Sequence, residues 1–400
     1  MQEVEIQGKE KGMFRKKSIL FLFVFVLIVG VSAGVWAGNL EPSEPPGATM
    51  KPLDQIEPRT ALIPGPVPIG ADYRVLIQEP GTYYLTADIT VNFRHAVKIT
   101  ASNVTLDMNG FRLYSSWTPP TLQNQDFDGI HIADGCENIE IRNGSIVSDT
   151  AEGRKGFRYG VYAAETSCCI RLSNIRVIGS RREGIWLGGV GSQVNGCTVC
   201  RNGAGIYAGH KNTIQFCCVS ENTTEDIASI YGITVGNSGR IVGNQVFKNG
   251  TDGSGCTVGI LAGEGSVVKE NVVRENGENC SGYVEGIYVG IGSVVADCTV
   301  TGNGMLVSDS IGIWAAKGVS VLNCDVSNNG FCAQNSSVGI FAMECCTLKN
   351  NVVYSNGFGC GICLGIYAPF YCLLDGNAAY EQTENIYTNT GCVLGLNMTP

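Results

Sequence analysis

The stretch "GIYVGIGSVVADCTVTGNG", residues 286–304, decides the fold of this chain. It consists of short runs of β-branched residues interrupted by glycine. It contains neither the 3.6-residue apolar stripe nor the capping residues that mark a helix. Such a pattern predicts several short strands joined by tight turns.

The Gly-Ile pair that opens this stretch recurs along the chain, with Val in place of Ile once. The intervals between successive pairs are 31, 24, 21, 27, 27, 27, 26, 27 and 26 residues. A repeat of this length is typical of a solenoid, in which each unit packs on the next. The ten pairs begin at Gly129, Gly160, Gly184, Gly205, Gly232, Gly259, Gly286, Gly312, Gly339 and Gly365.

Positions counted from each of these glycines, taken as position 0, predict which side chains face inward. Position +1 is always Ile or Val and position +3 is apolar, so both are expected in the core, because alternate residues of a strand share a face. Repeat units stacked about 4.8 Å apart place equivalent positions in columns. An inward column of Asn would hydrogen-bond along its own axis. From the fourth unit onward, position +12 is Asn or Cys: Cys217, Asn244, Asn271, Cys298, Cys324, Asn351 and Asn377.

Each unit has room for three short strands, which predicts an all-β, right-handed parallel β-helix of about 10–12 coils over residues 99–400. Recurrent "NG" pairs, as at Asn249 and Asn276, are expected to supply a left-handed turn after the last strand of a coil. The repeats, the Asn/Cys column and "ITASNVTLDMNGFRL" (residues 99–113) resemble bacterial secreted β-helix repeat proteins of the pectin-lyase-like superfamily. The resemblance covers roughly residues 73–395. It implies the fold more than an activity, because the superfamily includes lyases, hydrolases, epimerases, binding modules and structural proteins.

The N-terminal part is expected to precede the repeats. Residues 1–37 match a signal peptide, with the basic "MFRKK", a long apolar run and small residues in "VWA"; the alternative is an uncleaved membrane anchor. Residues 38–50 are a Pro-rich linker. Residues 51–98 are expected to form an N-terminal cap and the first strands, with "YRVLIQEPGTYYLTADITV" (residues 73–91) as two strands about a Pro-Gly turn that cover the first edge. The mature chain would then be secreted, periplasmic or at the cell surface, without a membrane segment.

Charge and cysteine content narrow the partners and cofactors. The net charge of −9 argues against a nucleic-acid partner. All 18 cysteines lie beyond residue 135, and we expect many of them to be buried free thiols, with turn and loop pairs as the best disulfide candidates. "CTVC" and "CGIC" have zinc-like spacing but lie about seven coils apart, so no metal site is expected.

Position +2 lies between two inward residues and should point outward. Two interpretations fit its aromatic residues: rings that stack on one another as a wall, or a platform for sugar rings. The resemblance favours the platform, because the substrate cleft of that superfamily runs along this strand. The aromatic residues, predicted to bind substrate, are Tyr162, Trp186, Tyr207, Tyr288, Trp314, Phe341 and Tyr367.

Candidate catalytic residues gather near the first units: Asp128, His131, Glu165 and Arg182. Two carboxylates on neighbouring coils would suit a glycoside hydrolase, whereas a base with a nearby cation would suit a lyase. Seven basic residues between 154 and 182 either bind an acidic polysaccharide or form ion pairs with nearby Asp and Glu side chains. The polygalacturonase pattern is absent, since "AGHKN" (residues 208–212) stands where Gly-His-Gly would be required. No cofactor is expected, apart from Ca²⁺ if the protein is a lyase.

The sequence therefore predicts an exported, monomeric β-helix that binds or degrades carbohydrate through an outer aromatic groove, as a polysaccharide lyase or a glycoside hydrolase. Its partner would be a polysaccharide or a cell-surface glycan. The alternative is a surface-structural or adhesive solenoid without catalysis.

Overall fold

The computed structural model describes residues 59–116, 127–149, 156–223, 229–250, 255–399, which form one compact unit of strands and turns. The expected signal peptide, the linker and the first part of the expected cap lie outside these residues. Within the described part, no helix is long and apolar enough to cross a membrane.

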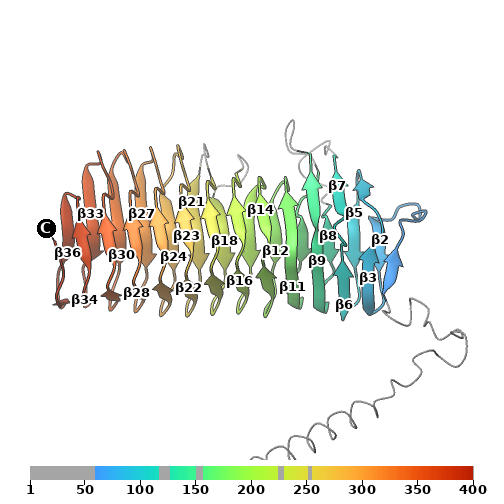
Figure 1. Cartoon of the computed structure of the whole chain (residues 1–400), viewed down its shortest axis with the longest axis horizontal. Coiled ribbons are helices and arrows are strands. Elements are labelled where there is room, and N and C mark those ends of the chain that lie inside the picture. Colours follow the sequence, from blue (N-terminus) through green and yellow to red (C-terminus); the bar gives the residue numbers. More distant parts are fainter. Residues whose placement is uncertain (1–58, 117–126, 150–155, 224–228, 251–254, 400) are drawn as a thin grey trace, which may run out of the picture. The chain divides into compact units, whose positions relative to one another are not determined.

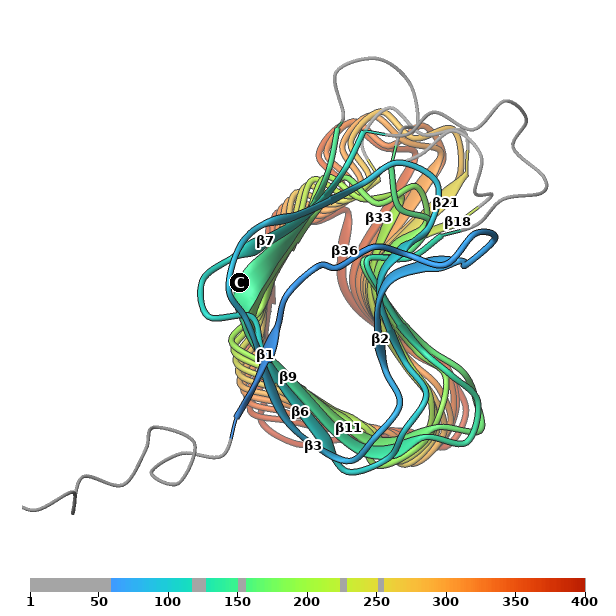
Figure 2. The same ribbon diagram turned by 90° about the vertical axis from the view of Figure 1, so that its right-hand side faces the viewer.

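The chain winds into a right-handed parallel β-helix of about 11 turns, as expected (Figure 1). One strand of each coil joins a 13-stranded parallel sheet, here called the front sheet, which bends inward when seen along the helix axis (Figure 2). Its strands are β2 (Tyr73–Ile77), β5 (His95–Ile99), β8 (Ile130–Ile132), β10 (Val161–Ala163), β12 (Glu183–Leu187), β15 (Ala204–Ala208), β18 (Ser229–Val235), β21 (Cys256–Ala262), β24 (Val284–Val289), β27 (Asp309–Ala315), β30 (Ser336–Ala342), β33 (Ile362–Ala368) and β36 (Glu384–Thr388).

The remaining strands form a 24-stranded back sheet of two rows, which the long strands β9 and β11 join. The first row is β1 (Thr60–Leu62), β3 (Gly81–Leu85), β6 (Val104–Asp107), β9 (Glu137–Ser148), β11 (Cys168–Ile178), β13 (Gln193–Asn195), β16 (Thr213–Gln215), β19 (Arg240–Val242), β22 (Val267–Lys269), β25 (Val294–Ala296), β28 (Ser320–Leu322), β31 (Thr347–Lys349), β34 (Leu373–Asp375) and β37 (Val393–Leu394). The second row also uses β9 and β11 and adds β4 (Ile89–Val91), β7 (Arg112–Ser115), β14 (Thr198–Cys200), β17 (Cys218–Ser220), β20 (Gln245–Phe247), β23 (Val272–Arg274), β26 (Thr299–Thr301), β29 (Asp325–Ser327), β32 (Val352–Tyr354) and β35 (Ala378–Tyr380).

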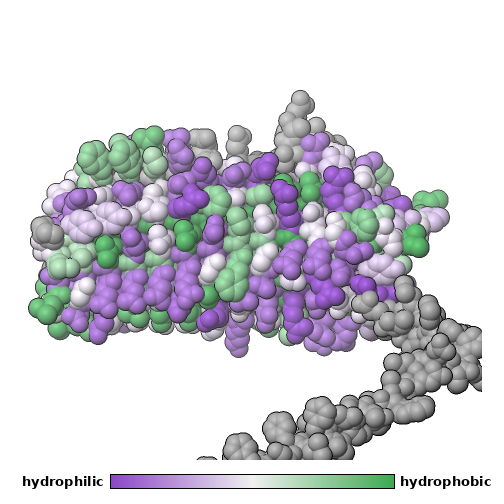
Figure 3. All heavy atoms as spheres, in the orientation of Figure 1, coloured by the Kyte–Doolittle hydropathy of each residue, from purple (hydrophilic) through white to green (hydrophobic). Residues whose placement is uncertain are grey.

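The repeat positions stack in register, as expected. In the pairing of β24 with β27, Ile287 lies opposite Ile313 and Tyr288 opposite Trp314. Every +1 residue from Ile130 to Ile366 is buried, and so is every +3 residue. The surface in Figure 3 accordingly shows hydrophilic and hydrophobic rows that run across the coils.

The recurrent glycine at position 0 is required by close packing and not by its backbone conformation. None of the ten glycines has a positive φ angle. A Cβ atom at Gly286 would lie 2.5 Å from Cγ1 of Val300 and 2.6 Å from the carbonyl oxygen of Gly312. The front strand therefore approaches the core too closely for any side chain at this position.

The predicted inward Asn column at +12 is confirmed. The side-chain amide of Asn244 donates to Oδ1 of Asn271 at 3.0 Å, and that of Asn351 donates to Oδ1 of Asn377 at 2.9 Å. The cysteines of the column are buried as well. These bonds satisfy buried amides that would otherwise destabilise the core.

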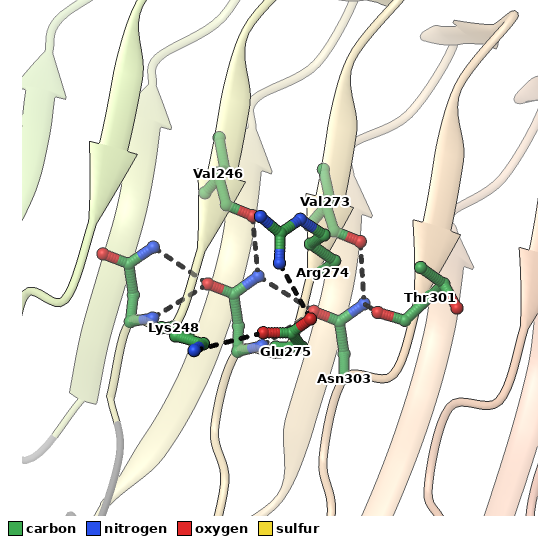
Figure 4. Close-up of polar contacts among 9 residues, drawn as sticks. Val246, Lys248, Val273, Arg274, Glu275, Thr301 and Asn303 are labelled. Atoms are coloured by element: carbon green, nitrogen blue, oxygen red, sulfur yellow. Dashed lines mark hydrogen bonds and ion pairs between the residues drawn. The ribbon is translucent and has the colours of Figure 1, made fainter. Parts of the chain in front are cut away.

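A second Asn ladder was not expected from the sequence. The asparagines of the "NG" pairs are buried, and Asn276 donates to Asn303 at 2.9 Å while Asn303 donates to the carbonyl oxygen of Val273 at 3.1 Å (Figure 4). The left-handed conformation belongs to the following glycine, as at Gly277 with a φ of 71°. The "NG" pair thus provides a core hydrogen-bonding residue together with the turn.

Residues 73–91 differ from the cap that the sequence suggested. Strands β2 and β3 do not pair with each other: β2 pairs with β5 in the front sheet, and β3 pairs with β1 and β6 in the back sheet. The Pro-Gly turn is therefore a corner of the first coil. The alternation of apolar residues is the same for a hairpin and for a coil, so the sequence pattern alone did not separate them.

Sixteen of the cysteines are free thiols, as expected for many of them. Cys360, in the loop before β33, and Cys363, on β33, form the disulfide of "CGIC". Stacked thiols on neighbouring coils hydrogen-bond to each other, and the bond from Cys372 lowers the pKa of Cys346 to about 7. Side chains in a parallel column keep their Cβ atoms too far apart for a disulfide, which explains the free pairs.

Candidate functional site

Asp128 and His131 form a hydrogen-bonded pair on the outer side of the front sheet. Asp128 precedes β8 and is buried, and its Oδ2 lies 2.8 Å from Nδ1 of His131. The backbone N–H of Tyr159, on the next coil, donates to the other carboxylate oxygen at 3.3 Å. Because a carboxylate only accepts hydrogen bonds, His131 donates from Nδ1, and its Nε2 takes no part in this bond.

The imidazole of His131 is held between two other rings. The ring of His95, one coil earlier, has its centroid 4.4 Å away, and the ring of Tyr162, one coil later, is stacked at 5.3 Å. The side chain of His131 is nevertheless 24% exposed. It is therefore fixed in orientation but still open to a ligand.

His95, on the preceding coil, holds the backbone of Asp128 in place. Its Nδ1 accepts the backbone N–H of Asp128 at 2.9 Å, so its own proton is on Nε2. Burial, and next the charge of His131, lower the pKa of His95 to about 3, so it is neutral at physiological pH. Burial raises the pKa of Asp128, and the hydrogen bond from His131 opposes that shift.

His95, Asp128 and His131 are the one group of three possible metal ligands, among the described residues, whose donor atoms lie within 4.8 Å of one another. Nδ1 of His95 already accepts a backbone hydrogen bond, and both oxygens of Asp128 are engaged. A metal ion would have to displace these bonds. The arrangement fits an Asp-His acid-base pair better than a metal centre.

Positive charge gathers beside the pair. The charge of Arg158 acts on both Asp128 and Tyr162, and its guanidinium lies 4.9 Å from the ring centroid of Tyr159. Lys98 precedes His131 in the same column and pairs with Asp72 at 2.6 Å. An anionic substrate group in front of His131 would meet these cations.

The predicted basic cluster is divided between two faces. Arg171 and Arg176 lie on β11 in the back sheet, away from the Asp128 and His131 pair. Arg158 and Arg182 precede β10 and β12 of the front sheet, and Arg154 and Lys155 lie outside the described residues. These residues are close in the sequence, but a corner of the coil lies between them and turns the chain from the front sheet to the back sheet.

The other two predicted catalytic residues, Glu165 and Arg182, make no hydrogen bond or ion pair with Asp128 or His131 within the described chain. Glu165 is exposed in the turn after β10. Arg182 is exposed, with its Nε 3.7 Å from Glu183 and its N–H bonded to the carbonyl oxygen of Arg158. Both remain predictions for substrate contact.

The seven predicted aromatic residues share one column, but the column has a gap. Tyr162, Trp186 and Tyr207 form a first run and the others form a second; Thr234 and Leu261 separate them. Neighbouring rings contact each other along the second run. In the first run Trp186 stacks on Tyr207 with centroids 3.9 Å apart, and Tyr159 contacts both Tyr162 and Trp186. Ring faces within a run are therefore covered by neighbouring rings, as the wall interpretation expects, and mainly ring edges face outward.

No sequence pattern pointed to His95 or Tyr159 as a site residue. His95 lies in the segment assigned to the cap, before the first Gly-Ile unit, so no repeat position identified it. Tyr159 precedes a position-0 glycine, and burial raises its pKa to about 12. The residue before each such glycine points outward beside position +2, as the contact of Asp128 with His131 demonstrates. This second outward column could have identified Tyr159 from the sequence.

Comparisons with known proteins found no matching family model and no matching curated protein. Among solved structures, the periplasmic alginate epimerase AlgG is 12% identical, with a TM-score of 0.48 over 86% of this chain and 83% of that one. The A-module of an Azotobacter vinelandii mannuronan C-5 epimerase is 12% identical, with a TM-score of 0.43 over 80% of this chain and 87% of that one. A tailspike of Acinetobacter baumannii bacteriophage Fri1, a capsular polysaccharide depolymerase, is 12% identical, with a TM-score of 0.42 over 81% and 60%.

Proposed function

We propose that this chain is an exported lyase that cleaves an acidic polysaccharide at the Asp128 and His131 site. The observation that carries the proposal is the 2.8 Å bond between these side chains, which leaves Nε2 of a partly exposed histidine free beside Tyr162 and Arg158. An imidazole whose Nδ1 is held by a carboxylate is a suitable general base through its Nε2.

In the proposed reaction, Nε2 of His131 takes the proton from the carbon next to the uronate carboxylate. The electron pair of that C–H bond forms the new C=C bond, and the bond to the leaving glycosidic oxygen breaks. The phenol of Tyr162 gives its proton to that oxygen. Arg158 neutralises the carboxylate and the negative charge that develops beside it.

Hydrolysis is less well supported by the same residues. A glycosidase needs one carboxyl group as acid and a second as base or nucleophile. Asp128 is buried and bonded to His131, and Glu165 is exposed in a separate turn. A lyase uses the base and the cations that are already together.

The direct test is an assay of the purified chain with polygalacturonate, alginate and glucuronan, scoring unsaturated products and reducing ends separately. We expect unsaturated products, a loss of about 10²–10⁴-fold in rate for His131→Gln, and a smaller loss for Asp128→Asn. His210→Gln, in an exposed histidine on another coil, is the matched control. Reducing ends without unsaturation would establish hydrolysis instead, and no products from any substrate would favour the structural or adhesive alternative.

Two further experiments test whether the activity needs Ca²⁺ and whether the chain is exported as a monomer. We expect activity to persist in EDTA, because Arg158 takes the role that Ca²⁺ has in other lyases; loss of activity in EDTA, restored by Ca²⁺, would contradict this. In the proposal the mature chain is a monomer that begins at Gly38. N-terminal sequencing and light scattering of the exported protein check both points.

A further inference from the structure

We propose that a cleft beside Tyr288, separate from the Asp128 and His131 site, binds a neutral sugar unit of a glycan. The cleft has a volume of about 390 Å³ and lies at the turns that follow the front strands β18 to β30. This volume is within the range of small-ligand sites. Its main lining side chains are Asn237, Glu264, Tyr288, Ile291, Lys317 and Met343.

Tyr288 offers a ring face that the other rings of its run do not. Trp314 contacts rings on both sides, Tyr288 at 5.8 Å and Phe341 at 4.9 Å. Tyr288 has Trp314 on one side, but its neighbour in register on the other side is Leu261. The gap in the aromatic column therefore leaves one face of Tyr288 without a ring, and an aromatic face is the surface on which the C–H side of a sugar packs.

The turns after β18 and β21 form a polar wall of the cleft. Oδ1 of Asn237 accepts the backbone N–H of Glu264 at 3.1 Å, which orients its amide N–H groups away from that bond. The carboxylate of Glu264 makes no hydrogen bond or ion pair with another described residue. An amide donor and a carboxylate acceptor beside an aromatic face match the hydroxyl groups of a pyranose ring.

Two glycines keep this wall in place. A Cβ atom at Gly263 would meet the backbone nitrogen of Asn237 at 2.7 Å, and one at Gly290 would meet that of Glu264 at 2.7 Å. The successive turns are packed directly on one another. The polar groups are therefore positioned before any ligand binds.

The charge of the cleft indicates a neutral sugar. Its one cation, Lys317, pairs with Glu344 at 3.1 Å, and Glu264 adds a further negative charge. A uronate would meet no uncommitted cation there. Six coils separate His131 from Tyr288 in the column, roughly 29 Å, so only an extended glycan could reach both places.

The inference rests on the proposed carbohydrate function, and binding without turnover tests it separately. Calorimetry would compare hexamers of β-1,4-glucan, β-1,4-mannan and α-1,4-glucan with hexagalacturonate on the full chain. We expect at least one neutral hexamer to bind and Tyr288→Ala to weaken it about tenfold. The matched control is Tyr354→Ala, which removes a half-buried, stacked tyrosine from β32 of the back sheet.

A second variant guards against simple misfolding of Tyr288→Ala. Leu261→Phe adds a ring in the gap of the column, and this ring should pack on the face of Tyr288 that has no ring neighbour and weaken binding. Failure of all three neutral hexamers to bind, or wild-type affinity in both variants, would overturn the inference. His131→Gln should bind the neutral hexamer normally; if it does while every elimination assay is negative, the lyase proposal fails and the cleft stands.

Discussion

At the scale of single residues, the position before the repeat glycine holds a buried carboxyl group in two units, Asp128 and Glu285. In the first unit it is Asp128, which holds His131. In the seventh unit it is Glu285, which is 4% exposed and lies in register between Val258 and Ile311. The same backbone position thus provides a hydrogen-bonded carboxylate in one coil and an apolar-flanked carboxyl group in another.

Glu285 should make stability depend on pH. Burial raises its pKa to about 7, above the ordinary value of 4.5, so the folded state binds the proton more tightly than the unfolded state. The stabilisation is fully present below pH 4.5 and is lost as the pH rises through 7. Between pH 4.5 and 8 we expect the unfolding free energy to fall by about 3 kcal/mol more in wild type than in Glu285→Gln.

Urea unfolding at a series of pH values measures this difference. Glu384→Gln is the matched control, because Glu384 is in the equivalent position of the last coil and is exposed. Its pH profile should follow that of wild type. Parallel profiles for wild type and Glu285→Gln would contradict the prediction.

At the scale of elements, the asparagine ladders join the corners of successive coils. Each amide in a ladder donates to the next asparagine and also to a backbone carbonyl oxygen of the preceding coil. Asn276 is typical: it bonds Asn249, Asn303 and the carbonyl oxygen of Val246. The corner therefore depends on a chain of side chains from different coils and not on one local turn.

Removing one rung should be costly. Asn276→Ala leaves two buried donors of Asn249 without their acceptor and removes the bond to the carbonyl oxygen of Val246. We expect the unfolding free energy to fall by about 3 kcal/mol. Chemical denaturation followed by circular dichroism measures it, with the exposed Asn92→Ala as a control that should change stability by less than about 0.5 kcal/mol. A loss for Asn276→Ala as small as that of the control would exclude a structural role for the ladder.

At the scale of the whole molecule, regular and irregular repeats have different roles. Intervals of 26 or 27 residues dominate from the fourth unit onward, and there the columns are uniform. The Asp128 and His131 pair lies where the intervals are 31 and 24 residues. Irregular coils bring unlike residues side by side, which a catalytic site needs, whereas uniform coils mainly build core.

Uniform columns also predict the thiol content of the whole chain. Since parallel stacking keeps neighbouring cysteines from bonding, denatured and unreduced protein should titrate 16 free thiols, with Cys360 and Cys363 as the remaining pair. Mass mapping of alkylated peptides would identify the unreacted pair. Fewer than 16 thiols would show disulfides between coils, and 18 would show that the "CGIC" pair is reduced.

The sequence by itself determined the solenoid, the inward residues at +1 and +3, the Asn and Cys column and the outward aromatic column. These follow from spacing along the chain, because side chains alternate across a strand and equivalent positions stack. Sequence spacing also brought Asp128 and His131 together, since they are three positions apart at the start of one strand.

Only the tertiary structure placed His95 beside that pair, separated the arginines onto two faces, covered most ring faces with other rings and left one face of Tyr288 without a ring neighbour. Each of these depends on which residues meet across neighbouring coils. That lateral register follows from loop lengths and backbone bends that differ from coil to coil, and no periodic pattern in the sequence encodes it.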